Sequence, residues 1–400
     1  MRNLKIFTDN IDEKALQQIN TLLEQDVFKN SKIRIMPDVH AGTGCVIGFT
    51  GDLGDKVIPN IVGVDIGCGM RIVELGNIEL DLDKLDNMIR GYIPSGMNVH
   101  ESPIDGADSY INELICKDEL KNKDNWLKKS LGTLGGGNHF IEIDVDDENN
   151  KYLVIHTGSR NLGKQVAEIY QEKAIKYCSY EKEMNDEKRK IIKEYKEQHR
   201  EKEIQNKLIE ISEKYKGKTK LPKDLCYLEG DLRDDYLHDM KICQDFAVEN
   251  RTNIAFKIIN TICSQFTFPK FFETVHNYIS FEDNIVRKGA ISAKKGEKVL
   301  IPMNMRDGCI IGIGKGNDDW NCSAPHGAGR IMSRMDAKKT LNLESYKDSM
   351  QNIYSTCVNE STIDESPMVY KPMDEIINNI KDTVDIVKII KPIYNFKASE

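Results

Sequence analysis

Six side chains able to bind a metal ion or attack phosphorus occur in five apolar or glycine-rich segments spread over the chain. They are Asp65 and Cys68 in VGVDIGCGM, His139 in GGGNHF, His156 in VIHTGSR, His276 in VHNY and His326 in SAPHGAGR. A thiolate can bridge two divalent ions, a carboxylate adds negative charge, and neutral imidazoles complete the coordination. One Asp, one Cys and three His therefore suffice for a two-metal site, which leaves one histidine over.

The spacing of Asp65 and Cys68 supports this interpretation. Three positions apart in a glycine-containing turn, their side chains can converge on one point, and Gly67 and Gly69 allow close approach of backbone or ligand. A lone cysteine is usually an inert small hydrophobe, and a lone buried histidine is usually a hydrogen-bonded core residue. Several histidines in segments where an unpaired polar ring is costly favour a metal-dependent active site.

Composition indicates a globular protein with a substantial core. The chain has 400 residues, of which 40% are hydrophobic and 30% charged, enough for one large domain or two ordinary ones. The opening MRNLKIFTDN lacks the apolar core of a signal peptide, and no stretch approaches the roughly 18 apolar residues of a membrane span. We therefore expect a cytoplasmic protein. Its ten cysteines include no CxxC pair, and we expect them to be reduced thiols.

Residue patterns predict one α+β catalytic domain over residues 1–400. Strand LKIFT precedes a helix capped by Asn10 or Asp12, short β-rich runs fill residues 31–75, and FIEIDVD and KYLVIHTGS frame a turn at 146–150. Helical patterns cover residues 80–92, 107–130, 164–216, 231–263 and 374–389. Residues 164–223 are expected to form a charged helical insertion within the domain.

The charge distribution of that insertion allows two interpretations. The chain carries a net charge of −8, yet residues 170–223 hold 16 Lys and Arg against 11 Asp and Glu, a local +5 that leaves −13 elsewhere. Mixed charges at helical spacing are typical of a solvated helical hairpin. Clustered lysines are also what binding to an RNA backbone requires.

The motifs resemble the RtcB-type RNA ligases, the GTP-dependent tRNA-splicing and RNA-repair ligase family. MPDVHAG, VGVDIGCGM, LGTLGGGNHFIE, HTGSR, HN, RKGAI and HGAGRxMSR follow one another in the family's order from about residue 36 to residue 334. YKPMDEII and the late lysine of KPIYNFKA are similar to the family's closing segment. The resemblance therefore covers nearly the whole chain and implies an RtcB-like fold with mixed β-sheets around a two-metal site.

The resemblance implies a reaction and a ligand set. Family members join an RNA 3′-phosphate or 2′,3′-cyclic phosphate end to a 5′-hydroxyl end, using GTP and two Mn²⁺ ions. By resemblance, Cys68 bridges the ions, Asp65 and His139 bind one of them, and His156 and His276 bind the other. An archease-like activator protein is a further partner that the family leaves open.

The resemblance assigns the remaining histidine, His326, as the nucleophile that attacks the α-phosphate of GTP and carries GMP. The nucleotide contacts implied are Asn138, Gly327, Ala328, Gly329, Arg330 and Lys397. The residues implied beside the site are Asp38, His40, Glu142, Arg160 and Arg334. From residue chemistry alone, HGAG is only a glycine-rich turn and Lys397 is a lysine near the chain end.

Departures from the family pattern leave alternatives open. PMNMRDG puts Asn304 and Asp307 where the better-known ligases have small residues before the guanine pocket, so preference for guanine is less secure. Together with the long insertion, this predicts a divergent bacterial-type paralogue whose RNA need not be tRNA. A binuclear phosphoesterase that hydrolyses RNA ends without a nucleotide would use the same ligands. A noncatalytic RNA-end-binding protein could keep the fold.

Overall fold

Two β-sheets, a smaller mixed one and a larger antiparallel one, form the centre of the molecule in the computed structural model, which describes residues 3–52, 54–121, 125–262 and 269–398. The smaller sheet has the strand order β1 (Asn3–Ile6), β2 (Lys32–His40), β3 (Ile47–Gly51), β11 (Val286–Lys288) and β10 (Asn277–Ile279). Strand β1 pairs with β2 in parallel, and the other pairings in this sheet are antiparallel. Two short pairs join β12 (Ala290–Ser292) to β15 (Ser323–Pro325) and β4 (Lys56–Val57) to β8 (Leu228–Glu229).

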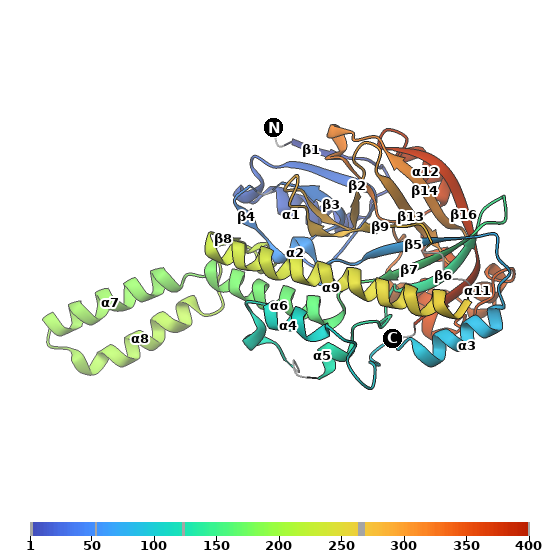
Figure 1. Cartoon of the computed structure of the whole chain (residues 1–400). Helices are drawn as coiled ribbons and strands as arrows, with labels where there is room; N and C mark the ends of the chain where they lie inside the picture. Colours follow the sequence, from blue (N-terminus) through green and yellow to red (C-terminus); the bar gives the residue numbers. More distant parts are fainter. Residues whose placement is uncertain (1–2, 53, 122–124, 263–268, 399–400) are drawn as a thin grey trace.

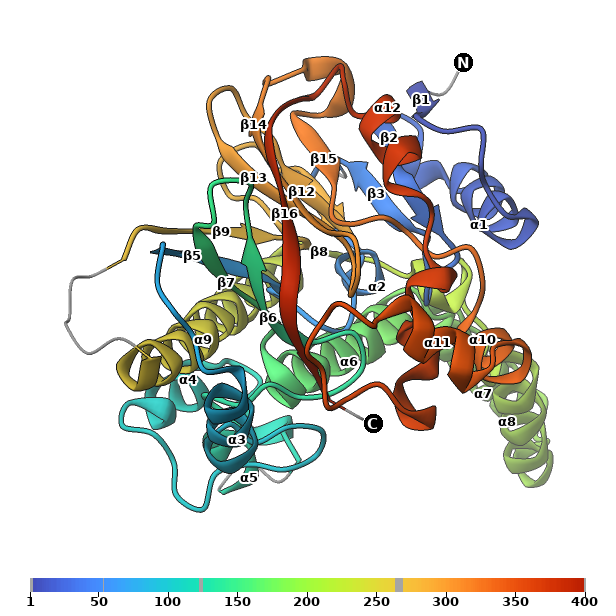
Figure 2. The same cartoon turned by 90° about the vertical axis from the view of Figure 1, so that its right-hand side faces the viewer.

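The larger sheet is antiparallel throughout, and it carries most of the candidate ligands. Its order is β13 (Lys298–Asn304), β14 (Gly308–Gly314), β16 (Val384–Lys397), β6 (Phe140–Val145), β7 (Lys151–Thr157), β5 (Gly69–Gly76) and β9 (Phe271–Val275). Figure 2 shows the long β16 between β14 and β6. Strands β6, β7, β5 and β9 are consecutive neighbours, so loops at one edge of the sheet meet.

Helices surround these sheets, except for two that project away from them (Figure 1). The helices are α1 (Glu13–Leu23), α2 (Pro59–Val62), α3 (Leu82–Tyr92), α4 (Ala107–Glu113), α5 (Trp126–Lys129), α6 (Arg160–Tyr177), α7 (Glu181–Glu197), α8 (Glu201–Tyr215), α9 (Asp231–Ile262), α10 (Arg334–Thr340), α11 (Leu343–Ser349) and α12 (Met373–Asn379). Among the described residues, no helix is both long and apolar enough to cross a membrane.

Side-chain alternation buries both faces of the larger sheet. Ile141 and Ile155 lie on one face, where they pack with Ile254 and Ile258 of the long helix α9. On the other face, residues of β5 and β7 pack against β13 and β14, in a cluster that includes Met70, Ile72, Val154, Leu300 and Ile311. Because successive strand residues point to opposite faces, each strand supplies both clusters.

Helices α7 and α8 form an antiparallel hairpin that projects from the body of the protein (Figure 1). Within it, Glu187 accepts hydrogen bonds from Lys214 at 2.8 Å and Tyr215 at 2.7 Å. By contrast, α6 has buried residues and lies against α9 in the body. The assignment of residues 164–223 as an insertion stays a prediction, but the part that projects is residues 181–215.

The α+β prediction is confirmed, and many of the predicted elements are present. Asp12 is the N-cap of α1, accepting the Ala15 amide at 2.9 Å, and the β6–β7 hairpin turns at residues 146–150. The helix predicted to end near Cys263 is α9, and Cys263 itself lies outside the described residues. The predicted helix at 374–389 is wrong in its second half, because α12 ends at Asn379 and β16 begins at Val384. The β-branched run VDIVKII pairs with β14 there, so sheet pairing overrides the helical spacing.

Two adjacent buried residues of α9, Asn250 and Arg251, hold the loops at the ligand-bearing edge of the sheet. Asn250 accepts the Gly132 amide at 2.6 Å and donates to the Gly158 carbonyl at 3.2 Å. Arg251 donates to the carbonyls of Gly67 at 3.0 Å and Thr157 at 2.9 Å, and it forms an ion pair with Glu273. Buried carbonyls need such donors, so this pair fixes the backbone beside Cys68 and His156.

We expect Arg251→Met to destabilise the fold by about 3–5 kcal/mol, because it leaves the carbonyls of Gly67 and Thr157 without this buried donor and removes one of the two arginines that pair with Glu273. Urea denaturation measures this change in the free energy of unfolding. The control Lys241→Met removes an exposed ion pair with Asp245 from the same helix and should cost less than about 1 kcal/mol. Equal stability of the two variants would contradict the role given to Arg251.

Candidate metal centre and nucleotide cavity

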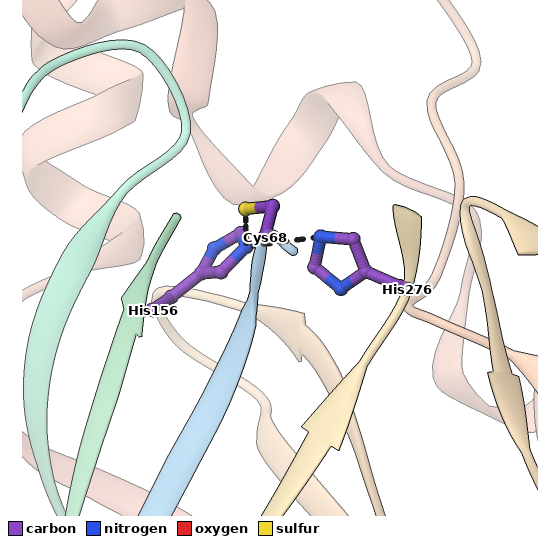
Figure 3. Close-up of side chains that lie close together, drawn as sticks. All are labelled: Cys68, His156 and His276. Carbon is purple, nitrogen blue, oxygen red and sulfur yellow. Dashed lines mark hydrogen bonds between the residues drawn. The ribbon is translucent and has the colours of Figure 1, made fainter. Parts of the chain in front are cut away.

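Five of the six predicted side chains meet at one edge of the larger sheet. Cys68 directly precedes β5, His139 precedes β6, His156 lies near the end of β7, and His276 directly follows β9. Asp65 lies in the loop that leads to Cys68. Because β5 is antiparallel to both β7 and β9, its start lies beside their ends. Figure 3 shows Cys68, His156 and His276 converging from these neighbouring segments.

The potential ligand atoms lie within contact distance of one another. Cys68 Sγ is 3.3 Å from His156 Nε2 and 3.5 Å from His139 Nε2. His156 Nε2 is 3.4 Å from His276 Nε2, and His139 Nε2 is 3.0 Å from Asp65 Oδ2. These atoms form two groups, each spanning no more than 4.8 Å: Cys68 with His156 and His276, and Cys68 with Asp65 and His139. Cys68 alone belongs to both groups, which is the arrangement that a bridging thiolate requires.

Hydrogen bonds fix which ring nitrogen faces the cluster. His139 Nδ1 lies 2.9 Å from the Leu134 carbonyl, and His156 Nδ1 lies 3.2 Å from the Asn138 carbonyl. A ring whose Nδ1–H donates to a carbonyl presents a lone pair at Nε2, the form that binds metals. His276 Nδ1 and Asp65 Oδ1 are buried and have no hydrogen-bond partner among the described residues.

Burial affects the protonation of two histidines and of Cys68 in different ways: it keeps the histidines neutral, the form that binds metal ions, and it disfavours the Cys68 thiolate in the absence of a cation. It lowers the pKa of His156 and His276 well below the usual value, with neighbouring histidines adding to the effect. Burial, followed by the Asp65 charge, raises the pKa of the Cys68 thiol. Burial opposes ionisation of Asp65, but the hydrogen bond and charge of His139 hold the pKa of that carboxyl below its usual value. The donor set of O, N and S atoms fits two divalent ions such as Mn²⁺.

Two glycines make this packing sterically feasible. A Cβ atom on Gly69 would overlap the Thr274 carbonyl of the adjacent strand β9, and one on Gly158 would overlap the Asp65 carboxylate. The sequence predicted that backbone or ligand approaches Gly69 closely, and the structure shows that the backbone of the paired strand β9 does so.

His326 belongs to neither ligand group and is held by Asp38. It follows β15, and its ring centroid is 4.8 Å from that of His276. Asp38 is fully buried on β2, and its Oδ2 accepts from His326 Nδ1 at 2.6 Å and from the His326 amide at 3.1 Å. With the proton held on Nδ1, the Nε2 lone pair of His326 is available for attack on an electrophile.

A cavity of about 840 Å³ opens in front of His326 and His156. The predicted residues that line it are His40, Asn138, Glu142, His326, Gly327, Ala328, Gly329, Arg330, Arg334 and Lys397. Asn304 also lines it, whereas the Asp307 carboxylate is held by Arg306 at 2.7 Å and Asn304 at 2.8 Å. Burial lowers the pKa of His40 to about 4, so this ring is neutral.

Arg160 is near the metal ligands but does not line the cavity. Its guanidinium donates to the Thr133 hydroxyl at 3.1 Å and the Gly96 carbonyl at 3.2 Å, and its charge helps to lower the pKa of Asp65. The residue has a φ of 58°, an uncommon conformation for a non-glycine residue, at the start of α6.

Glu365 is a functional-site residue that sequence reasoning missed. It is buried and accepts from Lys397 at 2.5 Å, Arg334 at 2.5 Å and the Tyr370 hydroxyl at 2.7 Å. Burial opposes its ionisation, but the charges of Lys397 and Arg334 lower its pKa to about 2. Glu365 therefore fixes three cavity-lining side chains from behind the cavity wall. The neighbouring motif YKPM was visible in the sequence, but nothing there linked Glu365 to a lysine 32 positions later.

Comparisons with known proteins identify the family of the chain. The family model for tRNA-splicing ligase RtcB matches residues 18–119 and 115–398. RNA-splicing ligase RtcB of Escherichia coli strain K12 is 29% identical over 436 aligned residues, covering 99% of this chain and 97% of that protein. RNA-splicing ligase RtcB1 of E. coli strain ATCC 25922 is 30% identical over the same shares of the two chains. tRNA-splicing ligase RtcB of Nanoarchaeum equitans is 25% identical, and the alignment covers 95% of this chain and 90% of that protein. The chain belongs to the RtcB family of RNA-splicing ligases.

Proposed function

We propose that this protein uses GTP and two Mn²⁺ ions to join RNA ends that carry a 3′-phosphate or 2′,3′-cyclic phosphate to RNA ends that carry a 5′-hydroxyl. The observation that carries the proposal is the position of His326. It is oriented by buried Asp38, lines the cavity, and lies next to His276 of the ligand cluster. A binuclear phosphoesterase requires only the ligand cluster, because a metal-bound water can attack phosphorus, whereas transfer of GMP requires a protein nucleophile.

In the first step, His326 Nε2 attacks the α-phosphorus of GTP. A phosphorus–nitrogen bond forms, the bond to the bridging oxygen breaks, and pyrophosphate leaves with that electron pair. The proton on Nδ1 stays in the hydrogen bond with Asp38, whose negative charge offsets the positive charge that develops on the ring. The attached group is labile enough to be transferred again.

In the later steps, an RNA 3′-phosphate oxygen attacks the guanylate phosphorus and His326 leaves as neutral imidazole. The RNA 5′-hydroxyl then attacks the activated 3′-phosphate, loses its proton and releases GMP. A 2′,3′-cyclic phosphate has to be opened by water to a 3′-phosphate first. Manganese ions held by Asp65, Cys68, His139, His156 and His276 would neutralise and orient the phosphates. Arg330, Arg334 and Lys397 place positive charge along the cavity for the same purpose.

The cavity also bears on the choice of base and RNA. The side chains of Asn304 and Asp307 are hydrogen-bonded to one another, but Asn304 lines the cavity and Asp307 does not, so we propose that Asn304 is the residue at this position that meets the nucleotide. We also propose that the cellular RNA substrate need not be tRNA and that an archease-like activator is a partner. We propose a cytoplasmic location because such RNA ends and GTP are available there.

We expect Cys68→Ala to lose more bound Mn²⁺ than His276→Ala, because Cys68 belongs to both ligand groups and His276 to one. Elemental analysis of purified, Mn²⁺-loaded protein gives the number of ions per chain. The control Cys45→Ala removes another buried thiol from a hydrophobic cluster and should keep the wild-type metal content. Full occupancy in Cys68→Ala would rule out the bridging role.

We expect His326→Gln to keep its metals and fold but to lose attachment of GMP by at least about a hundredfold, since an amide is not a nucleophile toward phosphorus. Incubation with [α-³²P]GTP and Mn²⁺ followed by a denaturing gel measures the labelling. The variant should still seal an RNA whose 3′ end already carries guanylate. Normal labelling of His326→Gln would place the guanylate on another residue, whereas a wild type that GTP never labels and that hydrolyses RNA ends would favour the phosphoesterase.

The RNA surface is proposed to lie at the base of the helical hairpin. Residues 181–215 carry ten basic and ten acidic residues, so the local excess comes mainly from Lys216, Lys218, Lys220 and Lys223. This basal segment leads to Asp224, which lies 3.3 Å from Asn60. The Asn60 carbonyl shares the Lys288 ammonium with the carbonyl of Thr43, a residue that lines the cavity.

We expect replacement of these four basal lysines by Gln to weaken RNA binding and to reduce its salt dependence, by about 0.7 in slope for each lost contact with single-stranded RNA. GMP attachment should be unchanged. The matched control replaces Lys188, Lys190, Lys196 and Lys202 of the hairpin, which alters net charge equally. RNA affinity that is unchanged in the basal variant, or lost equally in both, would reject this surface; fluorescence anisotropy across a salt titration measures it.

A further inference from the structure

Two buried carboxyl groups, those of Glu142 and Asp144, lie beside each other at the wall of the cavity. The residues are two apart on β6, so both side chains point to the same face of the sheet. Glu142 is 2% exposed and lines the cavity, whereas Asp144 is fully buried. A carboxyl oxygen of each residue and the Cys309 sulfur of β14 lie within 4.8 Å of one another.

These two groups do not have the donors that two carboxylate charges need. Glu142 accepts one hydrogen bond, from the Asn395 side chain at 2.5 Å. Neither Asp144 oxygen nor the Asn395 carbonyl oxygen has a partner among the described residues. The charge of Lys397 acts to lower the pKa of Glu142, but the Lys397 ammonium is paired with Glu365 at 2.5 Å. Two adjacent buried charges without their own cation would be strongly destabilising.

A single proton removes this conflict. Two carboxylates offer only acceptors, so their contact counts as no hydrogen bond until one of them carries a proton. Burial raises the pKa of both groups, and the charge of Glu142 raises that of Asp144 further. The groups that face the pair are Asn395 and Lys397 of β16, Cys309 of β14 and Tyr152 of β7, whose hydroxyl donates to Asp146. Since Asn395 and Lys397 both favour the ionised form of Glu142, the proton belongs on Asp144.

We propose that Asp144 is a positioning residue that stays protonated at neutral pH and donates a hydrogen bond to Glu142. Held by Asp144 and Asn395, Glu142 stays ionised and presents an acceptor to the nucleotide in the cavity. This inference rests on the proposed function only where it invokes a nucleotide. The shared proton itself is a property of the unliganded protein.

The first test is infrared spectroscopy of the unliganded protein, in which a protonated carboxyl has a carbonyl band separate from that of a carboxylate. The wild type should have such a band at neutral pH, and Asp144→Asn should lack it. Asp146→Asn is the matched control on the same strand, because Lys388 pairs with Asp146 at 2.8 Å and keeps it ionised. A band that survives in Asp144→Asn would overturn the proposal.

The second test is the KM for GTP in GMP attachment. Asp144→Asn keeps a donor toward Glu142 and should stay within about threefold of wild type at pH 7, whereas Asp144→Leu should raise the KM by about tenfold or more. The wild-type KM should rise as the pH increases through the raised pKa of Asp144, because the second ionisation places two charges side by side. Asp144→Asn has no such proton and should lack this alkaline rise. Circular dichroism checks that each variant is folded.

The remaining outcomes separate this inference from the proposed function. A metal ion that persists in Cys68→Ala and disappears in Asp144→Asn would make Glu142, Asp144 and Cys309 a cation site and overturn the shared proton. A wild-type KM in Asp144→Leu would overturn the positioning role. Loss of the infrared band only in Asp144→Asn, in a protein that GTP never labels, would support the shared proton and refute the ligase proposal.

Discussion

The rest of the structure depends on one constraint. The metal-ligand atoms of Asp65, Cys68 and three histidines are held in contact with one another, although they are lone-pair atoms that need a cation between them. His156 Nε2 and His276 Nε2 are 3.4 Å apart, and each lies in a ring whose pKa burial lowers. Such an arrangement is stable only if the surrounding backbone holds it. The order of β6, β7, β5 and β9, the glycines at 69 and 158, and the donors Asn250 and Arg251 of α9 all serve that requirement.

The proposed nucleophile, His326, is held by a different part of the fold. His326 follows β15, and Asp38 comes from the smaller sheet, so the short β12–β15 pair and β2 bring this dyad to the larger sheet's ligand edge. The cavity lies where the two meet, and its basic side chains are held by Glu365 rather than left free. Positive charge is thus fixed in the cavity, which would lower the cost of reorganisation in the proposed phosphoryl transfer.

Local sequence signals predicted what depends on neighbours in the chain. The N-cap at Asp12, the β6–β7 hairpin and the ligand-bearing segments all carry their own residue patterns. Contacts between residues far apart in the chain were not predictable from these local signals. Pairing with β14 makes a strand of the second half of the helix predicted at 374–389. The contacts of Glu365 with Lys397, and of Asp144 with Cys309, likewise join residues distant in the sequence. For the same reason, the excess positive charge of residues 170–223 could be counted from the sequence, but its position at the base of the hairpin could not be predicted.

The central claim is that His326 itself carries the guanylate. Its most direct measurement is peptide mapping by mass spectrometry of the wild-type protein after incubation with GTP and Mn²⁺, under alkaline conditions that preserve a phosphoramidate. The account predicts a single GMP adduct on the peptide that contains His326, with none on the peptides that contain His139, His156 or His276. An adduct on another residue, or no adduct under conditions in which RNA is sealed, would contradict it.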